Sequence, residues 1–225
     1  MISVIIPTYH EETALPATLR HLLAQSGEYE VIVVDGGSRD RTREIVQVEP
    51  RTRLLTAPKG RASQMNAGAK EAKGEWLLFL HADTLLPDGA LARLNRMEGD
   101  ADVQAGGFLH QFSGGDWRLR LISFLDNFRC VRSRVIYGDQ AMFVRCALFE
   151  KLGGFPDQPI LEDVAFCEKL IRVTEPVLLM PPVVTDSRKF VKMGIWKSFA
   201  RVLLIILHAQ FRLPVLPREF FSDVR

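Results

Sequence analysis

The sequence is poor in cysteine, in long apolar runs and in net charge, and each shortage argues against a class of protein. Its 225 residues include three cysteines, Cys130, Cys146 and Cys167, at wide spacings and without a Cys-x-x-Cys pair. An odd number at such spacings argues against a disulfide framework and against a zinc site. The pattern instead predicts reduced thiols in the core of a cytoplasmic protein.

Apolar runs are short, and the charges nearly balance. The longest run in the C-terminal part, Val202–Leu207, falls well short of the ~20 residues that span a bilayer. The N-terminal stretch Met1–Pro7 has no basic region and too short an apolar run for a signal peptide, so it is interpreted as a first strand. A formal net charge of +2 gives no argument for nucleic acid as a partner, and none is expected.

Polar residues follow three short apolar runs, at the points where the predicted strands end. The strands and the residues that follow them are Ile2–Ile6 with Pro7-Thr8-Tyr9, Glu30–Val34 with Asp35, and Trp76–Leu80 with His81-Ala82-Asp83. Helical sequence separates the strands, and right-handed crossovers place the carboxyl ends of parallel strands on one edge of a sheet. The polar ends are therefore expected to meet in one crevice of an α/β domain, and the length suits one such domain.

Two loops add local clues. Lys59 and Arg61, which precede a helix rich in small residues, suit phosphate oxygens, although a solvated basic turn would have the same composition. Asp35-Gly36-Gly37 follows its strand and does not form Gly-x-Gly-x-x-Gly, which disfavours a dinucleotide-binding dehydrogenase.

Taken in order, four segments resemble the family 2 glycosyltransferases of the GT-A fold. They are Val4–Tyr9 with Glu11, Val33–Asp40, Gly60–Gly68 and Phe79–Asp83, and the likeness extends over residues 1 to about 173. The resemblance implies an α/β fold with a Rossmann-like, mostly parallel central sheet, flanking helices and a C-terminal helical tail. It further implies a set of residues that hold a nucleoside diphosphate sugar. These are Pro7, Thr8, Tyr9, Glu11, Asp35, Arg61, Asn66, His81 and Ala82.

Asp83 occupies the metal-binding position of the family's Asp-x-Asp motif, so the resemblance implies Mg²⁺ or Mn²⁺ as a cofactor. The chain departs from this pattern at His81, where the family has a first carboxylate that contacts the ribose. His81 is expected either to donate a hydrogen bond in its place or to pack. From the residues alone, Asp83 could equally begin the turn before Pro87.

Glu162 and Asp163, after Gly153-Gly154-Phe155, resemble the catalytic end of the same family. The pair lies at the predicted N-terminus of a helix, where acidic residues also commonly complement the helix dipole. An inverting transfer needs a carboxylate that takes the proton of the acceptor hydroxyl. Asp163 is assigned as this base, and Glu162 as its orienting neighbour or alternate.

The remaining assignments concern the second half of the chain. Asp139 is expected to contact acceptor or sugar hydroxyls, or to be a turn residue. Arg188, with Lys189 as the second candidate, is expected to close over the diphosphate. The helical pattern of Trp117–Phe128 is expected to pack on the core rather than to bind an acceptor or a membrane. We expect a catalytic domain over residues 1–188.

Residues 189–225 form a basic amphipathic tail. The tail is expected to pack on the catalytic domain, to form a homodimer contact, or to lie on the inner face of the membrane.

These residues together predict a metal-dependent, inverting glycosyltransferase that moves a sugar from a nucleoside diphosphate donor, with a UDP-sugar favoured, to a hydroxyl acceptor by single displacement. The alternatives are a nucleotidyltransferase and a non-catalytic nucleotide-sugar-binding or scaffold protein. A nucleotidyltransferase would carry a basic, glycine-rich loop where this chain has Pro7-Thr8-Tyr9, and a binding protein has no need of Glu162-Asp163. The motif set also resembles a small bacterial subgroup with members associated with arsenosugar biosynthesis.

Overall fold

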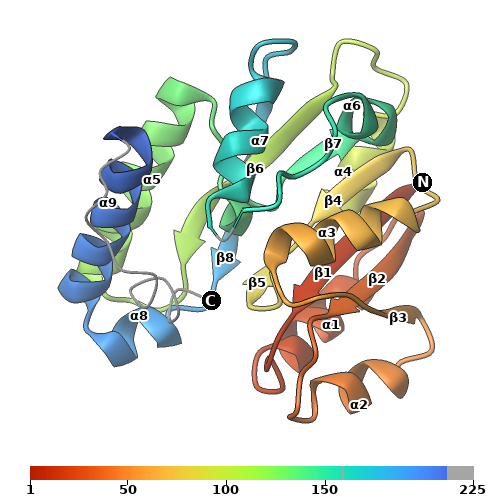
Figure 1. The fold of residues 1–225 in the computed structure, drawn as a ribbon, viewed down its shortest axis with the longest axis horizontal. Coiled ribbons are helices and arrows are strands. Elements are labelled where there is room, and N and C mark those ends of the chain that lie inside the picture. Colours follow the sequence, from red (N-terminus) through yellow and green to blue (C-terminus); the bar gives the residue numbers. More distant parts are fainter. Residues whose placement is uncertain (159, 212–225) are drawn as a thin grey trace.

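An eight-stranded sheet of order β3-β2-β1-β4-β7-β6-β8-β5 runs through the molecule (Figure 1). The computed structural model describes residues 1–158 and 160–211. The strands are β1 (Ile2–Thr8), β2 (Tyr29–Asp35), β3 (Thr52–Thr56), β4 (Trp76–Phe79), β5 (Thr84–Leu85), β6 (Ala105–Phe112), β7 (Phe143–Arg145) and β8 (Val177–Thr185).

The first half of the chain forms the parallel part of the sheet. Strand β1 pairs in parallel with β2 and β4, and β2 pairs in parallel with β3. Thr8 at the end of β1 lies opposite Asp35 at the end of β2, so the polar strand ends meet at one edge as predicted. The intervening helices are α1 (Leu15–Leu23), α2 (Thr42–Gln47), α3 (Arg61–Lys70) and α4 (Ala90–Arg96).

Both faces of the sheet are buried, which explains the unbroken apolar sequence of β4. Trp76 and Leu78 enter the core between the sheet and α1 and α4. Leu77 and Phe79 enter the core on the other face, with α3 and the later helices. An unbroken apolar run is typical of a strand that is covered on both faces, as β4 is here.

The second half completes the sheet with mixed pairing. Strand β7 pairs antiparallel with β4 and with β6, while β6 and β8 are parallel. The helical elements of this half are α5 (Trp117–Ser133), η1 (Gly138–Gln140), α6 (Cys146–Lys151), α7 (Glu162–Leu170), α8 (Arg188–Met193) and α9 (Ile195–Phe211).

The sequence of the last strand predicts that it covers Val177–Met180 and stops before Pro181-Pro182, but this is wrong, because β8 continues to Thr185. Leu179 of β8 lies opposite Phe108, and Val183 lies opposite His110, so three residues of β8 face one residue of β6. The prolines lie in this irregularity, where the missing N–H groups interrupt no regular ladder.

Helix α5 differs from its prediction. Trp117, Phe124 and Phe128, which were expected to pack on the core, are all more than 60% exposed. The buried positions are instead those of Leu119, Ile122, Ser123 and Cys130. The side chains that fill the core here are therefore smaller than those that face outward.

The described part of the tail packs on the domain through one side of α9. Ile195 joins a small core with Leu119 and Ile122 of α5 and Phe112 of β6. Among the described residues, no helix combines the length and the apolar character needed to cross a membrane.

Candidate active site

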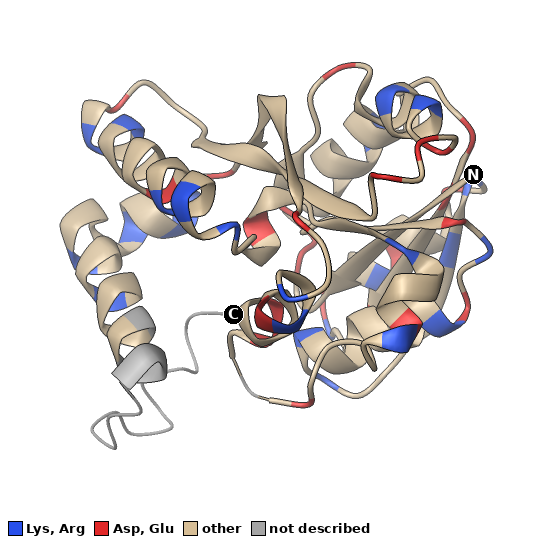
Figure 2. Ribbon diagram, turned by 90° about the horizontal axis from the view of Figure 1, so that it is seen from above, with Lys and Arg blue, Asp and Glu red and all other residues tan. Residues whose placement is uncertain are grey.

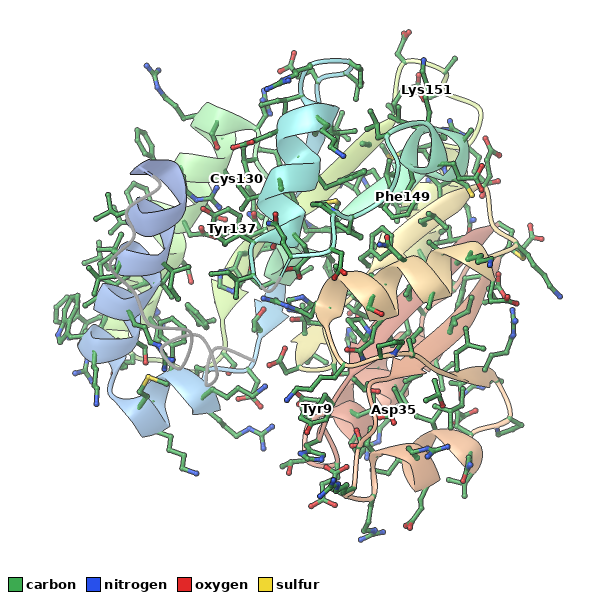
Figure 3. The ribbon with its side chains drawn as sticks, viewed as in Figure 1. Tyr9, Asp35, Cys130, Tyr137, Phe149 and Lys151 are labelled. Atoms are coloured by element: carbon green, nitrogen blue, oxygen red, sulfur yellow. The ribbon has the colours of Figure 1, made fainter. Side chains whose placement is uncertain are left out.

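A cavity of about 330 Å³ opens at the sheet edge where β1 and β4 end, between these strands, α7 and α9. Ten of the predicted site residues line it: Pro7, Thr8, Tyr9, Glu11, Arg61, His81, Ala82, Asp83, Asp139 and Asp163. Figure 3 shows Tyr9 and Tyr137 on opposite sides of this region, on the first and second halves of the chain. The predicted convergence of distant motifs is thus present in the fold.

Asp35 lies next to the cavity without lining it. Its side chain is fully buried, and Oδ2 accepts hydrogen bonds from the backbone N–H groups of Gly37 and Ser38, both at 3.0 Å. The other oxygen, Oδ1, is buried and has no hydrogen-bond partner among the described residues. A buried acceptor of this kind is costly unless a donor reaches it, so Oδ1 suits an N–H or O–H group of a ligand.

Asn66 does not line the cavity, and its amide group already has partners. Its Nδ2 donates to the carbonyl of Phe155 at 2.8 Å, and its Oδ1 accepts from the N–H of Phe155 at 3.0 Å. Asn66 therefore ties α3 to the segment that precedes α7, and this positions the catalytic end of the chain.

Arg61 joins the first turn of α3 to the first turn of α7. Its Nε lies 3.1 Å from Oε1 of Glu162, whose side chain is only 2% exposed. Burial acts to lower the pKa of Arg61, but the negative charges of Glu162 and the nearby Asp163 outweigh this effect and raise the pKa, so the guanidinium stays charged. Glu162 is consequently placed as a structural partner of Arg61 and does not line the cavity.

His81 lies against this guanidinium. Arg61 Nη1 is 3.4 Å from Nε2 of His81, which must accept because arginine only donates. Burial, and then the positive charge of Arg61, lower the pKa of His81 to about 4. His81 is thus a neutral imidazole at pH 7, which presents no charge where the family motif has a carboxylate.

Asp163 lines the cavity at the N-terminus of α7, and both of its oxygens are oriented by backbone donors. Oδ2 accepts from the N–H of Gly138 at 2.6 Å, and Oδ1 accepts from the N–H of Val164 at 2.8 Å. The side chain is 6% exposed. Two donors on a rigid backbone fix the carboxylate toward the cavity, which is the preorganisation that a general base needs.

Asp83 lines the cavity next to Glu11 and Lys189. The ammonium of Lys189 is 2.9 Å from Glu11 Oε1 and 3.5 Å from Asp83 Oδ2. Burial raises the pKa of Glu11 more than Lys189 lowers it. Lys189, the second candidate for closure over the diphosphate, lines the cavity. Arg188, the first candidate, pairs with Asp186 and does not line it.

The residues at Asp83 fit a metal ion only in part. Across residues 1–158 and 160–211, no three His, Cys, Asp or Glu side chains are grouped so that they could hold a metal by themselves. Asp83 and Glu11 do offer carboxylate oxygens at the cavity wall. Mg²⁺ is usually bound by one or two carboxylates together with the phosphates of a substrate, so the residues fit an ion whose remaining ligands come from a diphosphate.

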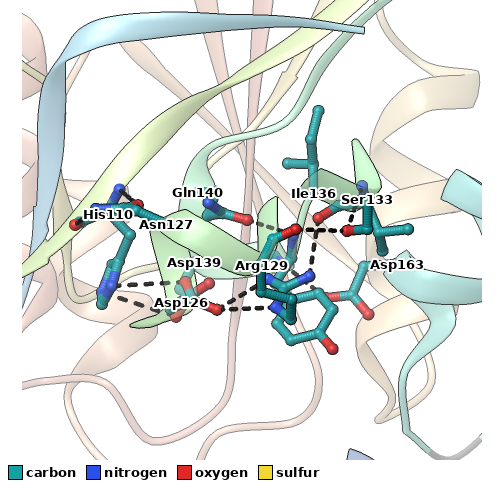
Figure 4. A network of polar contacts seen from close by, with 12 residues as sticks. His110, Asp126, Asn127, Arg129, Ser133, Ile136, Asp139, Gln140 and Asp163 are labelled. Carbon is teal, nitrogen blue, oxygen red and sulfur yellow. Dashed lines mark hydrogen bonds and ion pairs between the residues drawn. The ribbon is translucent and has the colours of Figure 1, made fainter. Parts of the chain in front are cut away.

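A polar network surrounds Asp139 and extends into α5 (Figure 4). Asp139 Oδ2 is 3.8 Å from His110 Nε2, and His110 Nδ1 is 4.0 Å from Asp126 Oδ2. Burial raises the pKa of Asp139. Neither ring nitrogen of His110 makes a hydrogen bond to a described residue. Asp139 thus lies beside a buried histidine that sequence reasoning had not identified.

Sequence reasoning also missed Gln64, because it lies in a helix noted only for its small residues. Its Nε2 donates to the carbonyls of Thr8 and Val34, both at 2.7 Å, and so fastens the ends of β1 and β2 together. The sequence signal that could have identified it was a glutamine among the small residues of this helix. Lys59, noted as a phosphate partner, lies 4.0 Å over the ring of Tyr9.

Two solved structures have a fold similar to that of this chain. The S. aureus TarS fragment 1–349 in complex with UDP matches with a TM-score of 0.67 and 20% identity, covering 82% of this chain and 60% of that one. The mannosyltransferase PcManGT from Pyrobaculum calidifontis, in complex with GDP-Man and Mn²⁺, matches with a TM-score of 0.65 and 23% identity, covering 99% and 68%. The chain therefore has the GT-A fold, as the sequence predicted.

Sequence comparison then gives the family. The profile described as "Glycosyl transferase family 2" matches residues 3–161, and the chain belongs to this family. A "PGL/p-HBAD biosynthesis glycosyltransferase" of Mycobacterium bovis is 34% identical over 166 residues, 69% of this chain and 63% of the relative. An "Undecaprenyl-phosphate 4-deoxy-4-formamido-L-arabinose transferase" of Aeromonas hydrophila is 34% identical over 105 residues, 42% of this chain and 32% of the relative. The chain thus spans less than two thirds of the length of these relatives.

Proposed function

We propose that the protein transfers a glycosyl group from a nucleoside diphosphate sugar to a hydroxyl acceptor, with inversion at the anomeric carbon. The observation that carries the proposal is the presence of Asp163 and Asp83 in one cavity, each delivered by a different half of the chain. A base on one side and a diphosphate site on the other are the two requirements of a single displacement.

The donor side is supported by the strand ends. Asp35 Oδ1 offers a buried acceptor, and the Tyr9 ring beside Lys59 offers a flat surface. Arg61, Lys59 and Lys189 bring positive charge to the cavity, which suits a diphosphate. A UDP-sugar is the favoured donor, since the TarS fragment that shares the fold was solved with UDP and with UDP-GlcNAc.

The acceptor side is supported by the N-terminus of α7. Gly138 and Val164 hold the Asp163 carboxylate in place, so that it can take the proton of the acceptor hydroxyl as the oxygen attacks the anomeric carbon. The bond from that carbon to the diphosphate breaks in the same step. Asp139, next to Gly138 on η1, lines the same cavity and would bind a hydroxyl of the sugar or of the acceptor.

Mg²⁺ or Mn²⁺ at Asp83, when bound, would neutralise the charge that collects on the departing diphosphate. Glu11 is the neighbouring carboxylate available to the same ion. Lys189 supplies a second positive charge at this position. The Mn²⁺ in the PcManGT structure is compatible with this proposal.

Several finer assignments belong to the same proposal. They are a catalytic domain over residues 1–188, a cytoplasmic location, and contact of the C-terminal segment with a membrane or with a second copy. Family membership favours glycosyl transfer over nucleotidyl transfer. Lys189 takes the place of Arg188 as the residue proposed to close over the diphosphate, because Lys189 lines the cavity and Arg188 does not.

The test uses three substitutions of aspartate by asparagine. Asp163→Asn is expected to lower kcat about 10²–10⁴-fold while UDP still binds, because only the proton acceptor is lost. Asp83→Asn is expected to weaken UDP binding in the presence of Mn²⁺ and to leave metal-free binding nearly unchanged. Asp88→Asn, at an exposed position outside the cavity, is the control. UDP release from a panel of UDP-sugars and calorimetry with UDP measure these effects, and full activity of both cavity variants would contradict the proposal.

A further inference from the structure

Helix α5 presents a continuous row of large apolar side chains to the outside. Trp117, Leu121, Phe124, Leu125, Phe128 and Val131 are between 39% and 66% exposed. They recur at helical spacing along one side of the helix, opposite the buried Leu119, Ile122 and Cys130. The core is filled by the smaller set, and much of the surface of the outer row is left exposed.

Helix α9 presents a second row of the same kind. Trp196, Leu203, Leu204 and Leu207 are between 42% and 48% exposed, while Ile195 and Ile205 are buried. The two rows meet at their aromatic ends, where the rings of Trp117 and Trp196 pack edge to face with centroids 6.2 Å apart. We call these two rows together the outer face of α5 and α9.

An apolar surface made by two neighbouring helices is unusual on a folded chain. The other exposed large apolar residues of the described chain, Val48, Ile171, Val173, Met180 and Val191, form no such row along a helix. Single residues need no explanation, whereas a contiguous apolar patch marks a surface that a partner or a lipid covers.

The charges around the outer face are positive. Arg120 and Arg132 are exposed on α5, and Lys192 and Lys197 are exposed on α8 and α9. Residues 188–211 contain no aspartate or glutamate. The acidic residue within α5, Asp126, pairs with Arg129 at 2.8 Å. Figure 2 shows these helices, at the left of the molecule, as mostly uncharged with basic segments.

We propose that the outer face of α5 and α9 binds the interface of an anionic lipid bilayer. Tryptophan and leucine at the depth of the headgroups, with lysine and arginine at the rim, are the side chains that such an interface accepts. A second copy of this chain would bring the same basic residues together and repel, so charge favours the lipid over self-association.

The outer face of α5 and α9 is turned away from the cavity. Phe190 and Met193 of α8 and Val202 and Ile205 of α9 line the cavity from the inner side of the same helices. A bilayer against the outer side would therefore be separated from the cavity by these helices. Lipid binding does not depend on glycosyl transfer, so it can be tested separately from the proposed activity.

The experiment measures co-sedimentation of the full chain with vesicles in the absence of any donor. We expect binding to phosphatidylcholine vesicles that contain phosphatidylglycerol, and much weaker binding to phosphatidylcholine alone. Tryptophan emission provides a second measurement, because Trp117 and Trp196 lie on the face whereas Trp76 is buried. Emission is expected to shift to the blue on binding.

Two variants and a control locate the contact. Phe124→Ser with Phe128→Ser is expected to weaken binding at least about tenfold, since both rings lose burial in lipid. Arg120→Gln with Arg132→Gln is expected to cost about fivefold per charge at low salt, and less at high salt. Val48→Ser changes an even more exposed apolar position away from the face, and this variant should bind as the unchanged protein does.

Four results would overturn the proposal. The first two are absence of binding to the anionic vesicles and undiminished binding by the phenylalanine variant. The third is a dimer of the unchanged protein in light scattering, with the phenylalanine variant a monomer. The fourth is protection of Trp117 and Trp196 from quenching by acrylamide in the absence of vesicles. The third result would mean that a second copy covers the face, and the fourth that the chain covers it itself.

Discussion

Lys189 is the cavity residue whose position was least expected. The sequence ranked it behind Arg188, yet its ammonium contacts Glu11 and lies 3.5 Å from Asp83. Burial acts to lower the pKa of Lys189, but the negative charges of Asp83 and Glu11 outweigh this effect and raise the pKa, so the side chain stays positive. Arg188 is one residue away, and its guanidinium is instead paired with Asp186.

We therefore predict different effects for two neighbouring substitutions. Lys189→Met should weaken UDP binding about tenfold, because a charge-assisted contact to a phosphate is typically worth ~1.5–3 kcal/mol. Arg188→Met should change it little, since its side chain does not line the cavity. Calorimetry with UDP measures both, and the prediction fails if the arginine variant loses more affinity than the lysine variant.

Single residues could be assigned from the sequence where one motif delivers one polar side chain to a strand end. Asp83 was assigned to the site on this basis, and Asp163 through its resemblance to the catalytic end of the family; both line the cavity. Asn66 and Glu162 could not be assigned in the same way, because their partners, Phe155 and Arg61, lie far away in the sequence. A polar residue in a motif can equally hold the site together or touch the ligand.

At the scale of elements, strands were predicted more securely than their ends and faces. The apolar runs of β1, β2 and β4 mark strands buried on both sides, and the structure confirms them. Helix caps were less readable. Ser38 is of a residue type that favours the start of a helix, but α2 begins at Thr42, and its preceding residue Arg41 makes no side-chain cap.

The face of α5 was beyond sequence reasoning for a physical reason. Periodicity shows that one side of a helix is apolar, and the larger residues are normally assumed to be inside. In α5 two sides are apolar, and the narrow space against β6 accepts Leu119 and Ile122 rather than Trp117 and Phe124. Only the packing of β6 and α9 decides which side is buried.

The element η1 positions the base through a glycine. A Cβ added at Gly138 would lie 2.7 Å from His81 Nε2 and 3.2 Å from Asp163 Oδ2. The same residue donates its N–H to Asp163. Gly138 thus allows the backbone to approach both side chains closely, which no other residue could do.

We predict that Gly138→Ala lowers kcat by about 10²-fold with only a modest change in donor affinity, because displacement of a catalytic group by about 1 Å is that costly. Gly115→Ala is the matched control, since a Cβ there would meet no atom within 4 Å. Steady-state kinetics and thermal unfolding of both variants measure the effect. A variant at Gly138 with unchanged kcat would show that Asp163 does not depend on this contact.

At the scale of the molecule, the function proposed above assigns the donor to the parallel half of the sheet and the acceptor to the mixed half. Arg61 of α3 and Glu162 of α7 join the two halves across the cavity. The order of motifs let the sequence predict this arrangement, whereas the way α8 and α9 close the cavity depends on contacts of Phe112, Phe190 and Ile195 that no motif records.

The incomplete set of metal ligands leads to a prediction about the order of binding. Within the described chain Asp83 has one carboxylate neighbour, Glu11, and both already contact Lys189. An ion at this position needs further oxygen ligands and must displace or share the ammonium, and a diphosphate supplies the oxygens. We therefore expect weak binding of Mn²⁺ to the free protein and much tighter binding with UDP present.

By linkage, Mn²⁺ should tighten UDP binding by the same factor, of the order of 5–150-fold for a typical coupling. Calorimetric titration of each ligand, with and without the other, measures both sides of the cycle. Lys189→Met is the informative variant, because without the ammonium Glu11 and Asp83 should bind Mn²⁺ more tightly in the absence of UDP. Tight binding of Mn²⁺ to the unchanged free protein would mean that the chain holds the ion by itself and that Lys189 does not compete for these carboxylates.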